Sequence, residues 1–348
     1  MRVLYYALGG GQGHALRGLA TLAGLRRRKR QTRVLLAAPC RFTAWARKQR
    51  VRLLSPPDDC RGREKLAEWA RRTVESFAPD ILLVDVFPRG VLGELGETGI
   101  SAGGSPACWL VCRRMRPDYY LDPGVRAFIE SRYRGLVWCE PPPPALEVLR
   151  VRQEMVSPLL IRRTGNCLGR ERAREALGVK PNSRLLLTLG SGDRQHQGDL
   201  LRLLDAICSR LRVRTGCDID LLFLSTVLKR EDLPGVPNDA RVDERFPAMR
   251  YLRAADLVVA AGGYHAFHEI RQLGLPAVFV PQRRKYDDQF WRVRNDPRAT
   301  EPAELETAIG EGLPAGGKLR PEAGEAGKPA ARCGVDQLLD IVLEQGAG

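Results

Sequence analysis

The sequence predicts an α/β protein with two doubly wound domains in tandem, each a mostly parallel sheet covered by helices. Short apolar runs alternate with amphipathic stretches along the chain, which is typical of parallel sheets. A chain of 348 residues is too long for one hydrophobic core of ordinary size. The prolines Pro141–Pro144 interrupt the alternation, because neither a helix nor a central strand continues through them.

The first half contains apolar runs separated by helical stretches. Its expected strands are 2–8, 33–38, 51–54, 81–85, 107–112 and 135–139. Helical spacing is clearest over residues 62–78, where the apolar positions are Leu66, Trp69, Ala70, Val74 and Phe77. Parallel strands need crossover helices of this kind, so the pattern predicts one doubly wound sheet.

The second half repeats the pattern. Its expected strands are 185–189, 220–224, 257–261 and 277–281, and its expected helices are 169–177, 199–212, 264–273 and 303–312. Ligands of such sheets bind outside the carboxyl ends of the strands. We therefore expect the two Rossmann-like domains to face each other across a cleft at those ends.

Composition shifts place the domain boundaries. Residues 1–157 are expected to form the first domain and residues 158–333 the second, joined through an extended linker over 157–163. Residues 313–334 are rich in Gly, Ala, Pro and charge, which favours a loose loop. The remaining segment, 334–348, contains an apolar helix at 335–344 that must pack somewhere, and we expect it to return to the first domain.

Charge is distributed unevenly. The net charge is +15, and residues 1–160 carry 27 basic and 15 acidic side chains. Residues 1–52 contain 13 basic residues and no acidic one. This asymmetry favours an anionic partner such as nucleic acid, anionic lipid or an acidic substrate, although a solvated basic surface explains it equally well.

The apolar runs and the cysteines indicate a cytoplasmic protein. No apolar run is long enough to cross a bilayer, and the chain opens on a strand instead of a signal peptide. The nine cysteines are scattered and form no CxxC pair, so reduced thiols are expected and a structural zinc is not.

The glycine-rich loop after the first strand reads Gly9-Gly-Gly-Gln-Gly-His14. It fits neither the GxGxxG spacing of dinucleotide sites nor the GK[ST] of P-loops, which disfavours both chemistries. Its residues Gly11, Gln12 and Gly13 instead lead to a histidine at a helix start, where a neutral imidazole acts as a general base. Asp85, which ends the strand 81–85, would orient that imidazole. The alternatives are a His14 that only closes the loop and an Asp85 that only caps a turn.

The second half carries a more specific pattern. The strand 257–261 leads through Gly262-Gly263 into a helix, whose N-terminal N–H groups suit a diphosphate. Glu269 in that helix could accept both hydroxyls of a ribose. Asp288-Gln289 offers donors and acceptors for sugar hydroxyls, and the loop 189–193 has glycines and Ser191 for phosphate oxygens.

Together these segments resemble the GT-B glycosyltransferases, and within them the MurG-like type of family 28. The resemblance covers residues 1–20 and 185–295. It is carried by the His14 loop, the Gly-Ser loop, and a specific block containing Ala255-Asp256, Gly262-Gly263, Glu269, Gly274–Pro281 and Asp288-Gln289. Three positions depart from that type: Gln12 stands for Gly, Arg17 for Pro and Asp288 for Gln, so the sugar need not be N-acetylglucosamine.

The resemblance implies inverting transfer from a nucleotide sugar, usually UDP-linked, to a hydroxyl, with no metal and no cofactor. His14 would be the base, aided by Asp85, and Glu269 would bind the ribose. The other implied donor-binding residues are Gly190, Ser191, Gly192, Arg245, Phe246, Gly262, Gly263, Tyr264, His265, Asp288 and Gln289. Helix N-termini and fixed N–H groups would stabilise the leaving diphosphate, so a cation is not required.

Two patterns imitate metal sites. Asp218-Ile-Asp220 is a DxD sequence, but it precedes a strand, which favours a surface turn. His265 and His268 precede Glu269 in the donor-site helix without forming HExxH, so ligand contact or packing is expected in place of zinc.

The N-terminal domain of this type binds the acceptor. Its basic residues, Arg26–Arg30, Lys48, Arg50 and Arg52, favour a lipid-linked acceptor and contact with the inner face of the membrane, although a helix C-terminus at 26–30 would also explain the cations there. A cell-envelope or secondary-metabolite acceptor stays open. A nucleic-acid partner is disfavoured because no RNP, KH or helix-turn-helix pattern is present. Two alternatives remain: a nucleotide-sugar epimerase or hydrolase of the same fold, and a nonenzymatic basic subunit that recruits a partner glycosyltransferase to the membrane.

Overall fold

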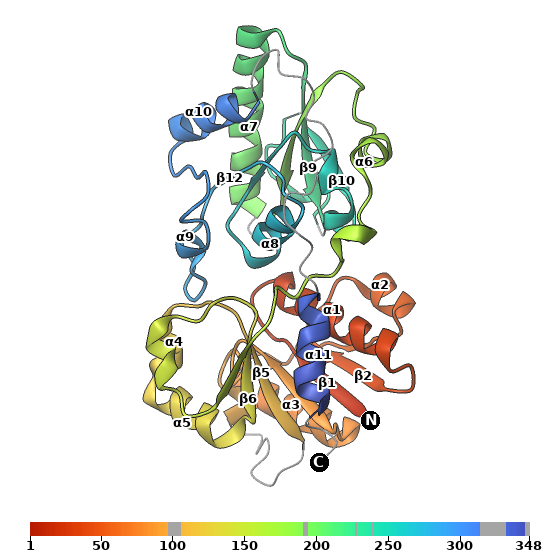
Figure 1. Cartoon of the computed structure of the whole chain (residues 1–348), viewed down its shortest axis with the longest axis vertical. Coiled ribbons are helices and arrows are strands. Elements are labelled where there is room, and N and C mark those ends of the chain that lie inside the picture. The colour runs from red at the N-terminus through yellow and green to blue at the C-terminus, as the bar shows by residue number, and fades with distance from the viewer. Residues whose placement is uncertain (97–105, 191–193, 227, 238–239, 314–331, 345–348) are drawn as a thin grey trace. The chain divides into compact units, whose positions relative to one another are not determined.

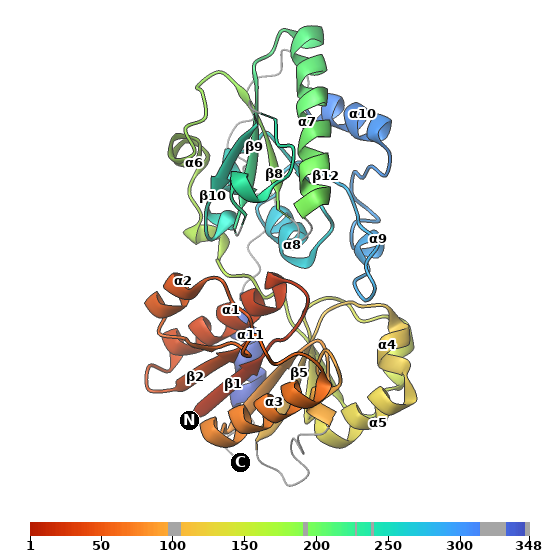
Figure 2. The same ribbon diagram turned by 180° about the vertical axis from the view of Figure 1, so that it is seen from behind.

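A computed structural model describes residues 1–96, 106–190, 194–226, 228–237, 240–313 and 332–344. The chain forms two compact units, one of Met1–Ile161 with Arg332–Gly348 and one of Arg162–Ala331 (Figures 1 and 2). It passes from the first to the second after Ile161, within a segment that has no regular secondary structure.

The first unit is built on a seven-stranded sheet in the order β3-β2-β1-β4-β5-β6-β7, and every neighbouring pair is parallel. The strands are β1 (Arg2–Tyr6), β2 (Arg33–Ala37), β3 (Arg52–Leu54), β4 (Ile81–Asp85), β5 (Ala107–Cys112), β6 (Gly135–Trp138) and β7 (Arg152–Met155). The central strands β4, β5 and β6 are buried along their whole length, which explains their continuous apolar sequences.

Helices cover the sheet of the first unit. They are α1 (Gln12–Arg28), α2 (Thr43–Lys48), α3 (Arg63–Phe77), α4 (Pro117–Leu121), α5 (Pro123–Arg132) and α11 (Gly334–Glu344). The last of them comes from the far end of the chain and lies beside α1 in both ribbon views (Figures 1 and 2).

The contact between α1 and α11 is close because one residue at it is a glycine. A Cβ built on Gly24 would collide with the side chain of Val335, so a side chain there would force the two helices apart. Arg28 and Asp340 form an ion pair of 2.6 Å at the same contact, and Gln337 Oε1 accepts a hydrogen bond from Ser157 N at 2.6 Å. These contacts fix the final helix on the first unit.

The second unit has a five-stranded parallel sheet in the order β10-β9-β8-β11-β12. Its strands are β8 (Arg184–Leu189), β9 (Ile219–Ser225), β10 (Arg241–Glu244), β11 (Leu257–Ala260) and β12 (Ala277–Phe279). Its helices are α6 (Arg170–Ala176), α7 (Arg194–Thr215), α8 (Tyr264–Gln272), α9 (Gln289–Arg292) and α10 (Pro302–Gly312). A core of side chains from α7, α10 and the strands β8, β9, β11 and β12 joins helices to sheet.

The predicted α/β fold class is confirmed in both units. The expected apolar strands form, with boundaries within a few residues of the structure, but the edge strands β7 and β10 were not predicted. Their sequences, RQEM and RVDE, are polar because an edge strand is exposed along one side. The loose loop predicted at 313–334 lies almost wholly outside the described residues. None of the helices described has the length and apolar composition to cross a membrane.

Candidate functional site

The first candidate site lies where β1 ends and α1 begins. Gly11 is the N-cap of α1, with extended backbone and no side-chain hydrogen bond across the cap. A Cβ on Gly9 would collide with the imidazole of His14, so this position needs glycine for the ring to lie against the loop. Gln12 Oε1 accepts from Arg41 N at 3.1 Å, which ties the loop to the residues after β2. The sequence therefore shapes the loop around the histidine.

His14 and Asp85 are in contact, as the sequence predicts. Nδ1 of the imidazole lies 2.6 Å from Oδ2 of Asp85, whose side chain is fully buried at the carboxyl end of β4. A carboxylate only accepts hydrogen bonds, so Nδ1 carries the proton and Nε2 keeps its lone pair. The imidazole also stacks on the ring of Phe87, with centroids 5.6 Å apart. This arrangement presents a basic Nε2 in a fixed orientation.

Two further side chains hold Asp85, and neither is among the site residues that the sequence predicts. Arg17 donates to both carboxylate oxygens, from Nε to Oδ1 at 2.8 Å and from Nη2 to Oδ2 at 2.6 Å. Tyr5 of β1 donates its hydroxyl proton to Oδ1 at 2.8 Å. Helical spacing offered a signal for the arginine, since Arg17 follows His14 by three positions and shares its face of α1.

Burial and charge set the protonation of this cluster. Burial by itself would raise the pKa of Asp85, but the guanidinium of Arg17 and the hydrogen bonds hold that pKa well below its usual range. The pKa of His14 is lowered, first by burial and further by the positive charges of Arg17 and Arg113, against the opposing effect of Asp85. At neutral pH the cluster therefore contains a carboxylate, a guanidinium and an uncharged imidazole.

The residue after Asp85 adopts an unusual backbone conformation. Val86 has φ +65°, which is rare for a β-branched residue. Phe87 N donates to Asp85 O at 2.7 Å across this turn, and the hydroxyl of Tyr120 donates to Val86 O at 3.1 Å. The turn puts the carboxylate and the phenyl ring against the same imidazole. Strain of this kind costs of order 1–3 kcal/mol and persists only where the surroundings hold it.

The second candidate site begins at the carboxyl end of β11, at the turn into α8. A Cβ on Gly262 would lie 2.9 Å from Val293 Cγ1, whereas a Cβ on Gly263 would meet no atom within 4 Å. Gly263 is the N-cap of α8 and provides no side-chain cap. Arg292 Nη1 donates to Gly262 O at 2.7 Å, and its Nη2 pairs with Asp287 at 2.9 Å. These contacts hold the turn in place. A helix N-terminus without an acidic cap is suited to an anion.

Glu269 lies on α8 and is buried, with 7% of its surface exposed. Burial raises the pKa of its carboxyl to about 8. In the described part of the chain the imidazole Nδ1 of His265 lies 4.0 Å from the Glu269 carboxyl, and no described group donates a hydrogen bond to that carboxyl. Tyr264 contacts the ring of His265 with a centroid separation of 5.2 Å, so this predicted group shares one end of α8. A buried carboxyl that receives no hydrogen bond from the described protein groups is suited to accept hydrogen bonds from the hydroxyl groups of a ligand.

The predicted sugar-binding pair already has partners within the chain. Asp288 accepts from Trp291 N at 3.2 Å and caps α9, and the side chain of Gln289 is buried. Gln289 Oε1 accepts from Gln282 N at 2.9 Å, and its Nε2 donates to Asp287 at 3.3 Å. These contacts fix the loop between β12 and α9.

Three of the remaining predicted residues, Gly190, Arg245 and Phe246, lie in loops of the second unit. Arg245 Nε pairs with Asp243 at 3.0 Å, and Phe246, the next residue, is half-buried. A Cβ on Gly190 would lie 3.1 Å from the Phe223 ring. Ser191 and Gly192 lie outside the described residues.

The metal-like sequences form no metal centre within the described ranges. Asp220 accepts a hydrogen bond from Ser183 Oγ at 2.9 Å, and Asp218 lies 3.4 Å from Lys180 Nζ at the amino end of β9. No three His, Cys, Asp or Glu side chains among the described residues gather as ligands would.

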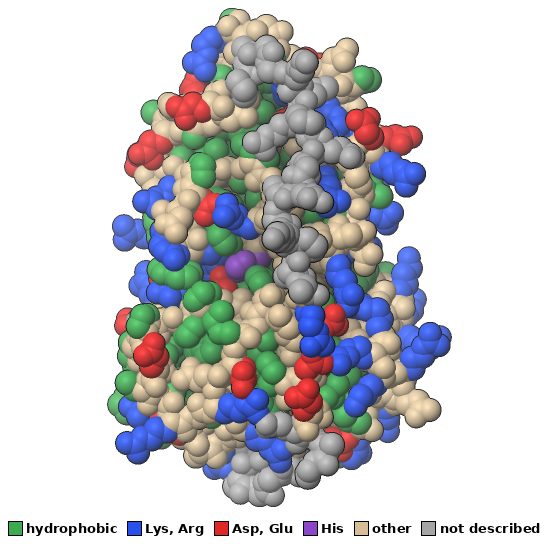
Figure 3. Space-filling model, viewed as in Figure 1, with side chains coloured by type: hydrophobic (Ala, Val, Ile, Leu, Met, Phe, Trp, Pro, Cys, Tyr) green, Lys and Arg blue, Asp and Glu red, His purple; other side chains and the backbone are tan. Residues whose placement is uncertain are grey.

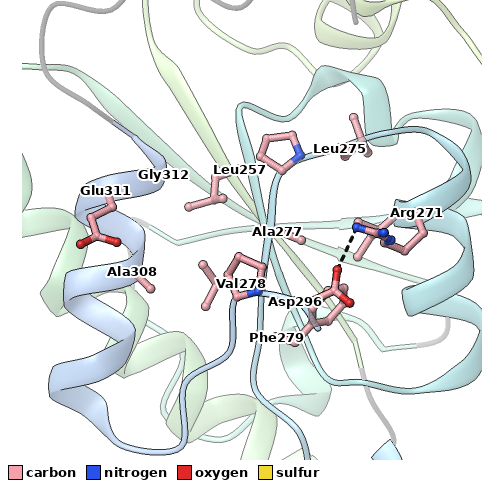
Figure 4. A pocket seen from close by; sticks show the side chains of 13 residues that line it. Leu257, Arg271, Leu275, Ala277, Val278, Phe279, Asp296, Ala308, Glu311 and Gly312 are labelled. Atoms are coloured by element: carbon pink, nitrogen blue, oxygen red, sulfur yellow. Dashed lines mark hydrogen bonds and ion pairs between the residues drawn. The ribbon is translucent and has the colours of Figure 1, made fainter. Parts of the chain in front are cut away.

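A pocket of about 350 Å³ lies between α8 and α10 in the second unit (Figure 4). It is lined by apolar side chains, including Leu257 and Ala277, with an ion pair of 2.9 Å between Arg271 and Asp296. Leu257 and Ala277 begin β11 and β12, so the pocket is at the amino ends of these strands. The Gly262 turn follows the carboxyl end of β11, which separates the pocket from the candidate site.

Solved structures match this chain, although no family model and no curated protein matches its sequence. One is the glycotransferase of kitacinnamycin, at 17% identity and TM-score 0.65 over 99% of this chain and 98% of that one. Spinosyn rhamnosyltransferase SpnG matches at 21% identity and TM-score 0.58 over 90% and 91%. MurG of Acinetobacter baumannii matches at 13% identity and TM-score 0.57 over 99% of both chains. The predicted fold is therefore confirmed: the chain has the two-domain GT-B fold of these glycosyltransferases.

Proposed function

We propose that this chain is an inverting, metal-independent glycosyltransferase that moves a sugar from a nucleoside diphosphate to a hydroxyl acceptor. The observation that carries the proposal is the contact between His14 and Asp85 at the carboxyl edge of the first sheet, within a fold that sugar-transferring proteins share. Fold alone does not imply function, whereas the chemistry of these two side chains does limit what the site can catalyse.

In the proposed reaction His14 Nε2 takes the proton of the acceptor hydroxyl. The hydroxyl oxygen then forms a bond to the anomeric carbon, while the bond from that carbon to the diphosphate oxygen breaks and its electron pair leaves with the diphosphate. Asp85 accepts from Nδ1–H throughout and so holds the ring in one orientation before and after proton transfer. Attack opposite the leaving group inverts the anomeric centre.

The donor is assigned to the second unit. The N-terminus of α8, with Gly262 and Gly263, suits the diphosphate, because its N–H groups stabilise the charge that develops on the leaving group. Glu269 would accept the ribose hydroxyls. A nucleoside diphosphate with a pyrimidine base is favoured, UDP or TDP, in keeping with a spinosyn rhamnosyltransferase structure described as complexed with thymidine diphosphate. No cofactor takes part in this scheme.

The acceptor is assigned to the first unit. Lys and Arg side chains gather on the side of this unit where Figure 1 shows α2 (Figure 3). The exposed basic side chains among residues 1–52 are Arg27, Arg28, Lys29, Arg30, Arg33, Arg41, Arg47, Lys48, Arg50 and Arg52. This charge favours an acceptor held on an anionic lipid surface, such as the cytoplasmic face of the cell membrane. An apolar aglycone, like that bound by one spinosyn rhamnosyltransferase structure, is the competing acceptor class.

Calorimetric binding of UDP, TDP, GDP and CDP in EDTA tests the donor site. We expect one pyrimidine nucleotide to bind with micromolar affinity, and Glu269→Ala to lose that binding. Glu244→Ala, at an exposed glutamate of the same unit, is the matched control and should bind like the wild type. If none of the four nucleotides binds, the proposal fails and the nonenzymatic reading takes its place.

Product analysis with the nucleotide sugar then separates the enzyme classes. Transfer to an added acceptor with inversion supports the proposal. Free sugar or an epimer formed without acceptor would instead identify a hydrolase or epimerase of the same fold.

A further inference from the structure

Arg17 occupies a place where a positive charge changes the chemistry of the neighbouring histidine. Its side chain is 2% exposed, and the carboxylate of Asp85 that it holds is 0% exposed. A carboxylate beside a histidine ordinarily has two effects, because it fixes the tautomer and also favours the imidazolium. The guanidinium of Arg17 affects only the second.

The geometry separates these two effects. Asp85 Oδ2 lies 2.6 Å from His14 Nδ1 and 2.6 Å from Arg17 Nη2, so one oxygen accepts from both groups. Arg17 Nη2 is 3.3 Å from His14 Nδ1, and both atoms carry protons. A charged imidazolium would thus gain an attraction to Asp85 and suffer a repulsion from Arg17 at comparable distances. The hydrogen bond that orients the imidazole remains, while the charges of Asp85 and Arg17 that face the ring sum to about zero.

We propose that Arg17 is a positioning residue that neutralises Asp85 and so keeps His14 an oriented but uncharged proton acceptor. The catalytic meaning of this arrangement rests on the proposed function, whereas the charge state of the imidazole does not. The same ion pair also locks the carboxylate plane, because the guanidinium binds both oxygens.

The other groups around the cluster do not favour a charged His14. Arg113, which follows β5, adds a second positive charge that lowers the pKa of His14. Tyr5 on β1 stays protonated, because burial raises the pKa of its hydroxyl well above the usual value. The thiols of Cys112 and Cys139 are buried near the carboxylate and the arginine, and burial raises the pKa of Cys112 well above its usual value. Neither Tyr5 nor Cys112 can therefore supply the negative charge that Arg17 removes.

Proton NMR of the imidazole Cε1–H signals tests the proposal on the intact protein without any substrate. The chain has four histidines, and His14→Gln assigns the signal of interest by its loss. In the wild type we expect His14 to titrate below about 6.5, the ordinary histidine value. Arg17→Gln should raise that pKa by about 1–3 pH units, because Asp85 then acts on the imidazole without compensation. Arg17→Lys keeps the charge and should keep the low value.

Arg174→Gln provides the matched control, since Arg174 is also buried and pairs with an aspartate, Asp256 at 3.2 Å, in the second unit. It should leave the His14 titration unchanged. An unchanged His14 pKa in a folded Arg17→Gln protein would overturn the proposal. If that variant does not fold, a wild-type His14 that titrates above about 6.5 overturns it, and one that titrates below supports it together with a retained low value in Arg17→Lys.

The two proposals fail in different ways. Absence of nucleotide binding would refute the glycosyltransferase assignment and leave the titration of His14 as it is. Where transfer activity is measured, the acid limb of kcat/KM should move to higher pH in Arg17→Gln and stay in place in Arg17→Lys. A loss of activity with an unmoved limb in Arg17→Gln would show a purely structural role for Arg17.

Discussion

Glu269 makes the stability of the second unit depend on pH in a direction unusual for a carboxyl group. Burial raises the pKa of this group from 4.5 to about 8 in the folded protein. Between those two values the folded state keeps a proton that the unfolded state has released. The contribution of Glu269 to stability is therefore complete below the unfolded pKa and is lost progressively as pH rises to the folded one.

The size of the effect follows from the difference between the folded and unfolded pKa of Glu269. Each pH unit in this window lowers the free energy of unfolding by about 1.4 kcal/mol, so a rise from about pH 5.5 to about pH 7.5 lowers it by about 2.7 kcal/mol. In Glu269→Gln the side chain does not titrate and the loss disappears. The difference in unfolding free energy between the variant and the wild type should therefore shift by about 2–3 kcal/mol in favour of the variant across this interval. It should level off above about pH 8.

Hydrogen exchange measured by mass spectrometry is the appropriate assay, because a chain of two units need not unfold in one transition. Peptides from β8 and β11 report the opening of the second unit. Glu244→Gln, at an exposed glutamate, is the control, and its protection relative to the wild type should not change as pH rises. A difference between Glu269→Gln and the wild type that does not change with pH would refute the reasoning.

Three other substitutions test separate parts of the structure. His14→Ala should lower transfer about 10²–10⁴-fold and leave nucleotide binding intact, which calorimetry and a kinetic assay measure together. Gly9→Ala should displace the imidazole, because the added methyl collides with it; an unchanged His14 NMR signal would contradict this. Gly24→Val should separate α11 from α1, so faster hydrogen exchange in residues 334–344 is expected, and unchanged protection there would count against the contact.

Local patterns predicted the central strands and most helices correctly. Strands such as β4 and β5 are buried on both faces, so a continuous apolar run identifies each of them from its own sequence. The edge strands β7 and β10 could not be recognised, because their polar residues follow from exposure that only the assembled sheet creates. Their short sequences resemble those of loops.

The candidate site shows the same division. Glycine spacing and strand ends were enough to select His14, Asp85 and Glu269 as functional candidates. Arg17 was noticed only as a departure from a family pattern, since its partner Asp85 is 68 positions away in the chain. Gln289 was expected to bind a sugar, and the structure engages its amide with Gln282 and Asp287, contacts that no local pattern reveals.

The sequence by itself determined the α/β class, the order of the apolar strands and the glycine turns at two strand ends, because these depend on residues close together in the chain. Tertiary structure alone decided the electrostatics. It placed the guanidinium of Arg17 against the buried carboxylate of Asp85, left Glu269 without a hydrogen-bond donor among the described residues, and brought α11 against Gly24. The physical reason is that burial and charge pairing depend on distances in space, which parallel strands create between residues far apart in sequence.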